Sequence, residues 1–174
     1  RLKMSSIPQV NLNDYLSGNS KSKEKFIKDL GKGFSEIGFV AVKGHLLNDE
    51  VKDSLYKEVK QFFNLPDSVK SKYIIKGLAS QRGFTPFGKE HAKGKNVIVE
   101  ELENFNKIGQ KTYELLEDTG RYILRAIACY LNLEETYFDN HIFNGNSILR
   151  AIHYPPITEE PKKAERAAAH GDIN

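Results

Sequence analysis

The sequence pattern with the clearest chemistry is His170-Gly171-Asp172, in which one residue separates a histidine from an aspartate. In an extended strand, side chains at positions i and i+2 project from the same face about 6–7 Å apart, so both can reach one metal ion. An imidazole and a carboxylate are two of the three ligands of the 2-His-1-carboxylate facial triad, which binds Fe(II) and leaves coordination positions open. Taken alone the signal is weak, because a His-x-Asp arises readily by chance, and the spacing by itself fits a solvated strand end better than a metal site.

A second pattern lies upstream, where residues 147–154 alternate like a strand that ends at a Pro-Pro pair. Period-two geometry places Arg150 and Tyr154 on one face and His153 on the other. A guanidinium and a phenol could bind a carboxylate ligand together, because Arg offers a fork of N–H donors and Tyr one directed O–H. Taken alone, these residues fit an exposed Arg beside a packed Tyr better.

Helices and short strands must position both patterns. Apolar residues at helical spacing predict three helices, and period-two or compact apolar runs predict the strands. The helices are one that carries Phe26–Ile37 and ends at Gly38, one from the N-cap Asn48 to Phe63, and a long one from Leu102 to Leu131. The strands are 7–12, a buried 39–42, 147–154 and 167–174; residues 13–22 are predicted as a loop leading to a helix N-cap, 76–95 as an irregular glycine-rich connector packed on the rest of the protein, and 135–138 as a helical turn.

The composition excludes several classes of function. With 174 residues, 39% hydrophobic and 28% charged, the chain has the balance of a soluble globular unit, and its net charge of +3 is too evenly mixed to indicate a nucleic-acid partner. No apolar run approaches the roughly 20 residues that cross a bilayer. A single Cys129 allows no internal disulfide and no cysteine zinc cluster, so we expect a cytoplasmic protein. Residues 1–3 precede the single Met4 and are expected to be foreign to the native chain.

Several longer motifs occur in a fixed order along the chain. They are Gly38–His45 (GFVAVKGH), Phe62–Pro66 (FFNLP), Gly83–Glu90 (GFTPFGKE), Leu149–Pro156 (LRAIHYPP) and Glu165–Asp172 (ERAAAHGD). In this order they resemble the isopenicillin N synthase-like branch of the Fe(II)- and 2-oxoglutarate-dependent oxygenases. Because the resemblance runs over nearly the whole chain, it is far more specific than one His-x-Asp and favours the metal interpretation.

The resemblance implies a role for each site residue. His170 and Asp172 match two Fe(II) ligands; the third, a second His, and an Arg-x-Ser that binds 2-oxoglutarate would lie beyond Asn174. Tyr154 matches a tyrosine that holds the distal carboxylate of 2-oxoglutarate or, in the synthase itself, touches the substrate. Arg150 shares its predicted face and is placed at the same cosubstrate or substrate pocket. The implied reaction is oxidation of a small organic substrate by O2, coupled to decarboxylation of 2-oxoglutarate to succinate. An Asp at position 172 disfavours the halogenase variant.

The resemblance also implies an α+β fold. Residues 4–131 are expected to form a helix-rich scaffold, and residues 132–174 to begin a double-stranded β-helix (jelly-roll) barrel that is incomplete in this chain. We therefore expect the active enzyme to be longer and this chain alone to be inactive. Two alternatives stay open: a 2-oxoglutarate-independent oxidase of the synthase type, and a non-catalytic fragment or binding module without a complete metal site. The expected partner is a small-molecule substrate, with no nucleic acid and no membrane; no oligomeric state follows from the sequence.

Overall fold

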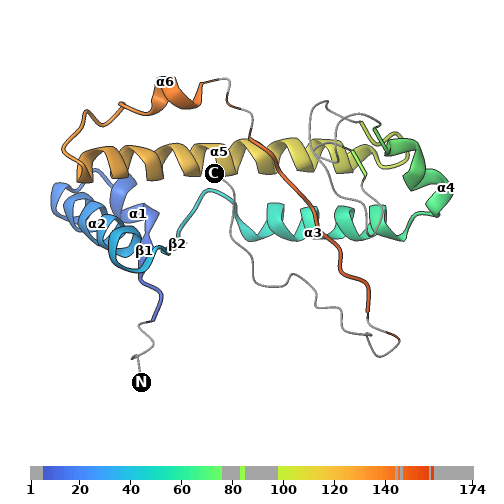
Figure 1. Cartoon of the computed structure of the whole chain (residues 1–174), viewed down its shortest axis with the longest axis horizontal. Helices are drawn as coiled ribbons and strands as arrows, with labels where there is room; N and C mark the ends of the chain where they lie inside the picture. Colours follow the sequence, from blue (N-terminus) through green and yellow to red (C-terminus); the bar gives the residue numbers. More distant parts are fainter. Residues whose placement is uncertain are drawn as a thin grey trace.

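The computed structural model describes residues 6–75, 83–84, 98–143, 145, 147–156 and 158. Helices α3 and α5 lie side by side along the long axis of the molecule, α1 and α2 pack at one end of α5, and α4 lies at the other end (Figure 1). The elements in chain order are β1 (Gln9–Asn11), α1 (Leu12–Leu16), α2 (Ser20–Lys32), the π-helical turn η1 (Gly33–Ile37), β2 (Ala41–Lys43), α3 (Asp49–Asn64), α4 (Asp67–Lys70), the 3-10 turn η2 (Ser71–Tyr73), α5 (Glu103–Tyr130) and α6 (Asp139–Ile142).

The longest element is α5, with 28 residues and a length of about 42 Å at 1.5 Å per residue. Its bounds confirm the helix predicted over 102–131, and neither Gly109 nor Gly120 interrupts it. After it the chain turns at Asn132, which adopts a left-handed backbone conformation with φ of 59°. The α3 helix confirms a second prediction, because the Asn48 side chain accepts a hydrogen bond from the Val51 amide at 2.9 Å and caps its N-terminus.

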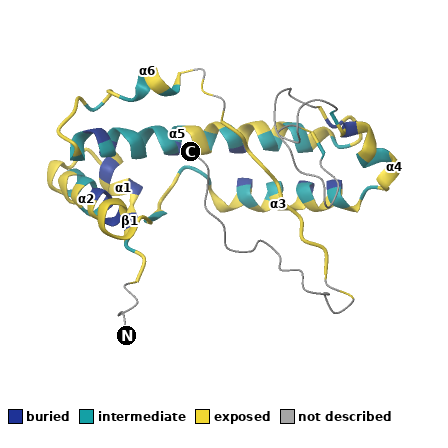
Figure 2. Cartoon of the chain, viewed as in Figure 1, coloured by how far each residue is buried: buried dark blue, intermediate teal, exposed yellow. Residues whose placement is uncertain are grey.

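Two separate hydrophobic clusters hold these elements together, and each uses one end of α5 (Figure 2). The first cluster joins β1, α1, α2 and the C-terminal part of α5, and the second joins α3, η2 and the N-terminal part of α5. The buried members of the first cluster are Val10, Leu12, Tyr15, Phe26, Leu30 and Ala126, and those of the second are Phe62, Tyr73 and Val99, with Phe63, Phe84 and Phe105 packed against them.

Strands β1 and β2 pair in parallel, with Val10 opposite Val42, which confirms that strands form near both predicted positions. The second strand begins only at Ala41, whose amide donates to the Pro8 carbonyl at 2.8 Å. The prediction of a buried strand over 39–42 was therefore wrong at its first residue and in its burial, because Val40, Ala41 and Val42 are only half-buried. Phe39 is 70% exposed, because it follows the left-handed Gly38 (φ 83°) that ends η1 and precedes the first strand hydrogen bond.

The predicted loop over residues 13–22 is wrong at its start, where α1 forms. The Asn11 side chain accepts a hydrogen bond from the Asn13 amide at 3.1 Å, and Leu12 and Tyr15, three residues apart, are both buried. These two effects make a short helix out of polar, loop-like residues. The predicted helix N-cap within this range is confirmed at Asn19, whose side chain accepts from the Ser22 amide. The turn predicted at 135–138 is present and leads into α6.

The strand predicted over residues 147–154 is wrong. Residues 147–156 have no regular secondary structure and are exposed, because a strand needs a hydrogen-bonded neighbour and the described residues pair only as β1 with β2 and as the isolated bridge Ile74–Gly83. The strand predicted over 167–174 lies outside the described residues. The helix-rich scaffold of the predicted α+β fold is thus present. Among the described residues, no strand of the expected barrel forms after β2. No helix of the described part is both long and apolar enough to cross a membrane.

Candidate functional site

The predicted metal ligands His170 and Asp172 lie outside the described residues, so their pairing stays a prediction. Within the part of the chain that the structure describes, no three His, Cys, Asp or Glu side chains gather closely enough to hold a metal ion.

The predicted cosubstrate residues Arg150 and Tyr154 lie on one exposed segment, residues 147–156. This segment, red in Figure 1, leaves the region of α5 and extends past α3. The Tyr154 side chain is 53% exposed, and Ile152, on the same predicted face, is 59% exposed. The packed Tyr of the alternative interpretation is therefore not what the structure shows, and this face of the segment is open to contact a ligand or further protein.

The structure shows that His153 brings this segment into contact with α3. The His153 ring stacks on the Phe63 ring with 5.1 Å between centroids and 27° between planes. Sequence reasoning placed His153 opposite Tyr154 but did not identify this partner. The available signal was the Phe62-Phe63 pair in the FFNLP motif, since adjacent helical residues project in different directions and only Phe62 is fully buried in the second cluster, which leaves part of the Phe63 ring open to another segment.

Phe63 is itself held in place by an aromatic group at the C-terminal end of α3. Phe62 is 6% exposed and contacts the Phe63 ring edge-on, with centroids 5.5 Å apart. Phe84 packs against both rings, which confirms, for the described part of the 76–95 connector, that it packs on the rest of the protein. The Lys70 ammonium donates to the Phe63 carbonyl at 3.1 Å and lies 5.8 Å from the centre of the Phe84 ring.

The start of α5 is joined to η2 by a polar group around Glu101. The Tyr73 hydroxyl and the Lys72 ammonium both donate to the Glu101 carboxylate, the latter at 2.9 Å. The hydrogen bond from Tyr73, followed by that from Lys72, lowers the pKa of Glu101 to about 2. These contacts join η2 to the residues that lead into α5, beside the second hydrophobic cluster.

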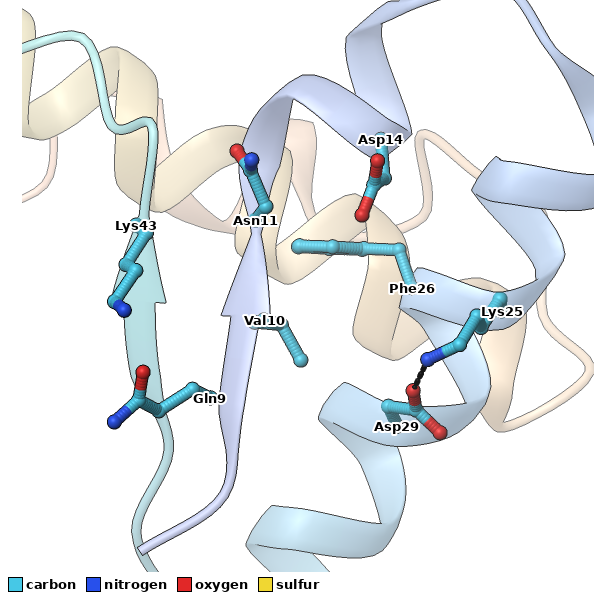
Figure 3. A pocket seen from close by; sticks show the side chains of 8 residues that line it. All are labelled: Gln9, Val10, Asn11, Asp14, Lys25, Phe26, Asp29 and Lys43. Atoms are coloured by element: carbon cyan, nitrogen blue, oxygen red, sulfur yellow. Dashed lines mark hydrogen bonds and ion pairs between the residues drawn. The ribbon is translucent and has the colours of Figure 1, made fainter.

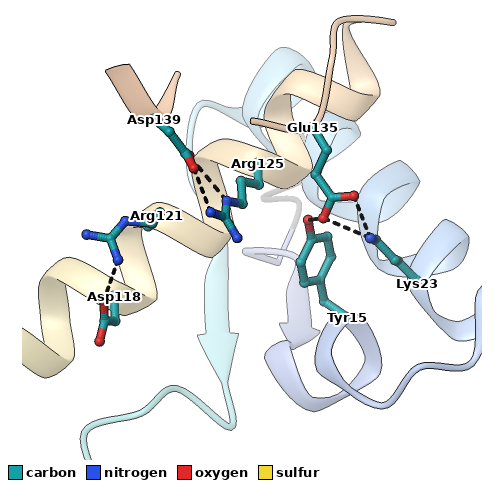
Figure 4. A network of polar contacts seen from close by, with 7 residues as sticks. All are labelled: Tyr15, Lys23, Asp118, Arg121, Arg125, Glu135 and Asp139. Atoms are coloured by element: carbon teal, nitrogen blue, oxygen red, sulfur yellow. Dashed lines mark hydrogen bonds and ion pairs between the residues drawn. The ribbon is translucent and has the colours of Figure 1, made fainter. Parts of the chain in front are cut away.

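A second polar network fixes the chain between α5 and the predicted site segment (Figure 4). The Tyr15 hydroxyl donates to Glu135 at 2.5 Å, and the Lys23 ammonium lies 2.8 Å from both oxygens of the same carboxylate. Burial, followed by the hydrogen bond to Glu135, raises the pKa of Tyr15 well above its usual range. Arg125 donates to both oxygens of Asp139, at 3.2 and 2.6 Å. The network thus holds residues 135–139, which follow α5, against α1, α2 and α5.

A pocket of about 260 Å³ lies between β1, β2 and α2 (Figure 3). Its lining is mostly polar, and the ion pair between Lys25 and Asp29 stands at one side of it. The residues that line it are Gln9, Val10, Asn11, Asp14, Lys25, Phe26, Asp29 and Lys43. None of the predicted metal or cosubstrate residues is among them, so this pocket is separate from the predicted site.

Residues 7–119, more than half of the chain, match the family model described as the N-terminal region of non-haem dioxygenases in morphine synthesis. The chain belongs to this dioxygenase family. Among curated relatives, the 2-oxoglutarate-dependent dioxygenase htyE of Aspergillus rugulosus is 23% identical over 202 residues, covering 96% of this chain and 61% of the relative. The 1-aminocyclopropane-1-carboxylate oxidase of Dictyostelium discoideum is 26% identical over 182 residues, covering 86% of this chain and 49% of the relative. The chain thus spans about half to three fifths of the length of these two relatives.

Solved structures agree with this family. A 2OG-Fe(II) oxygenase family protein from Caulobacter crescentus matches 98% of this chain and 62% of its own, with a TM-score of 0.82 and 33% identity. A Neurospora crassa protein solved in complex with alpha-KG and thymine matches with a TM-score of 0.66 at 18% identity, covering 76% of this chain and 50% of that chain, a likeness of fold. The resemblance to the isopenicillin N synthase-like 2OG-Fe(II) oxygenases is confirmed.

Proposed function

We propose that this chain is part of an Fe(II)- and 2-oxoglutarate-dependent oxygenase that oxidises a small organic substrate and releases succinate. The observation that carries the proposal is the likeness to the Caulobacter crescentus 2OG-Fe(II) oxygenase, which extends over 98% of the chain. The His170-x-Asp172 pattern supports it, because it supplies the metal-binding chemistry at the end of the same ordered series of motifs.

The chemistry of the donor set fits Fe(II). The imidazole of His170 and the carboxylate of Asp172 are the ligand types of the facial triad, and two such side chains leave room for a third protein ligand and for a chelating cosubstrate. When bound, Fe(II) supplies the activation of O2 that no side chain of the chain can provide. The third ligand, a second His, is proposed to come from the longer protein.

The chain's own residues supply binding and orientation. We assign the Tyr154 O–H to a hydrogen bond with a carboxylate of the cosubstrate or substrate, and the Arg150 guanidinium to a charge-assisted contact in the same pocket. The exposure of this segment to solvent, with Tyr154 53% exposed, supports this assignment. Helices α3 and α5 provide the rigid support that such positioning requires.

A second candidate is an oxidase that does not couple its reaction to 2-oxoglutarate. The observation that favours it is the relative from Dictyostelium discoideum named 1-aminocyclopropane-1-carboxylate oxidase, which covers 86% of this chain. In this case Tyr154 and Arg150 would contact the organic substrate directly.

The test uses the intact protein with Fe(II) and measures 2-oxoglutarate consumption, succinate release and 2-oxoglutarate binding. We expect one succinate for each 2-oxoglutarate consumed, and His170→Ala should lower the rate by about 100-fold or more, because even partners of metal ligands are worth 10–100-fold. His141→Ala is the matched control, since His141 lies on α6 outside the predicted site, and it should retain activity. Substrate oxidation without succinate release would favour the oxidase. Full activity of His170→Ala would contradict both functions.

A further inference from the structure

We propose that Phe63 of α3, acting through His153, positions Tyr154 in the cosubstrate pocket. Phe63 and His153 are positioning residues in this proposal, which rests on the proposed function of Tyr154. A contact between the helical scaffold and the segment that carries the site thereby sets the orientation of the Tyr154 side chain.

Phe63 offers a fixed surface for this contact. Its backbone carbonyl accepts from Lys70, whose side chain is 13% exposed, and its ring meets the edge of the buried Phe62. Phe62 in turn packs against Tyr73 and Phe105, with centroids 6.1 and 5.3 Å away. The ring of Phe63 is therefore attached to the second hydrophobic cluster and has little freedom to move away.

The orientation of His153 determines the orientation of the next residue, Tyr154. The His153 ring lies 5.1 Å from the Phe63 ring at 27°, the geometry of an offset stack, while the residue remains exposed to solvent. Pro155 favours extended backbone at Tyr154, and in extended backbone neighbouring side chains point to opposite sides, so a histidine that faces α3 turns Tyr154 away from α3. The 53% exposure of Tyr154 agrees with this orientation.

Pro155, the residue after Tyr154, restricts the backbone conformation of Tyr154 further. Pro155 disfavours the helical region for the residue before it and holds Tyr154 in extended backbone conformations. Tyr154 thus follows His153, whose ring α3 holds in place, and precedes Pro155, whose ring restricts the backbone of Tyr154. Loss of the stack removes one of these two restraints and should broaden the directions in which the phenol points.

The chain supplies a matched control for the experiment. His141 of α6 stacks on Tyr137 with nearly the same geometry, 5.2 Å and 25°, but Tyr137 lies only four residues earlier, so that stack joins no distant segments. His153→Ala removes the proposed contact without disturbing a buried residue, His153→Phe restores a ring, and His141→Ala removes an equivalent stack elsewhere. Phe63→Ala tests the other partner.

Three readouts are compared in the intact protein: the dissociation constant for 2-oxoglutarate measured anaerobically with Fe(II), the affinity for Fe(II), and the rate of trypsin cleavage after Arg150. For His153→Ala and Phe63→Ala we expect 2-oxoglutarate binding to weaken about 2- to 10-fold, the range that an aromatic pair supports. We expect faster cleavage after Arg150, unchanged Fe(II) affinity, and restoration of both altered values in His153→Phe. His141→Ala should behave like the wild type.

The outcomes separate this inference from the proposed function. If the wild type binds Fe(II) but no 2-oxoglutarate or substrate carboxylate, the proposed function fails and the positioning role fails with it, whatever the cleavage rates. If the wild type binds 2-oxoglutarate and His153→Ala binds it equally well, the proposed function stands and the positioning role is overturned. Equal weakening by His153→Ala and His153→Phe would also overturn it, because the ring stack would then not be the cause.

Discussion

Replacing Gly31 of α2 with alanine has two opposed effects on the stability of the protein. A glycine inside a helix is about 0.5–1 kcal/mol less favourable than alanine, so the helix itself should gain stability. However, Gly31 is buried against the Tyr130 ring at the end of α5. A Cβ atom at position 31 would overlap Cγ and Cδ2 of that ring and would lie 2.5 Å from Cδ1, well inside the ~3.5–4.0 Å at which two carbon atoms pack.

The steric effect should dominate. The overlap includes Cγ, the ring atom nearest the Tyr130 backbone, so a ring flip about χ2 cannot relieve it, and either Tyr130 must change its χ1 rotamer or the end of α5 must move away from α2. Overpacking of this kind costs about 1–3 kcal/mol. Subtracting the gain in helix propensity leaves a net loss between about 0 and 2.5 kcal/mol. From the middle of both ranges, we expect Gly31→Ala to lower the free energy of unfolding by about 1 kcal/mol, or Tm by about 2–4 °C for a protein of this size.

The assay is urea denaturation followed by circular dichroism at 222 nm, with two matched controls. Gly109→Ala and Gly120→Ala lie inside α5 with no neighbouring atom within 4 Å of the new Cβ, so both should raise stability by about 0.5–1 kcal/mol. The double variant Gly31→Ala/Tyr130→Ala should lose the steric penalty and deviate from additivity. A Gly31→Ala variant as stable as the two controls would refute the reasoning.

Two further predictions concern pH. The pKa of Tyr15 is raised in the folded state, so above the ordinary tyrosine pKa of ~10 the unfolded chain loses this proton before the folded chain does. The free energy of unfolding should therefore fall by up to about 1.4 kcal/mol for each pH unit above that value. Tyr15→Phe should reduce that slope in urea midpoints measured from pH 10 to 11.5, and an identical slope would contradict it. For Glu101, whose folded pKa is lowered to about 2, the stabilisation is complete above the unfolded pKa of ~4.3 and is lost as pH falls toward 2. Glu101→Gln should therefore show a smaller fall in Tm between pH 4.5 and 2 than the wild type; parallel Tm curves would count against the assignment.

The long elements of the scaffold follow from local sequence patterns. The stripe of apolar residues over 102–131 determines α5, and the Asn48 side chain determines where α3 begins. α1 could not be predicted in the same way, because Leu12 and Tyr15 become helical through burial in a cluster built from distant residues. Phe39 is an error in the opposite direction: its apolar run predicted burial, but this aromatic residue remains at the surface.

The candidate site, like the scaffold, could be predicted from the sequence only in part. Residue types and spacing indicated the chemistry of His170, Asp172, Arg150 and Tyr154, and the first two remain a prediction outside the described residues. The stack of His153 on Phe63 could not be derived from spacing, because it joins segments whose proximity depends on how the whole scaffold packs. The predicted strand over 147–154 failed for a related reason: alternation specifies the two faces of a strand but not the neighbour that it needs.

The position of α5 late in the scaffold has a consequence for how the chain folds during synthesis. The first cluster requires Ala126 and the second is packed by Phe105, so residues 6–75 cannot complete either cluster before α5 has been made. Phe105 is synthesised before Ala126, and the second cluster can therefore close first, although much of the first cluster's sequence lies nearer the N-terminus. Until then, the apolar faces of α2 and α3 remain available to chaperones.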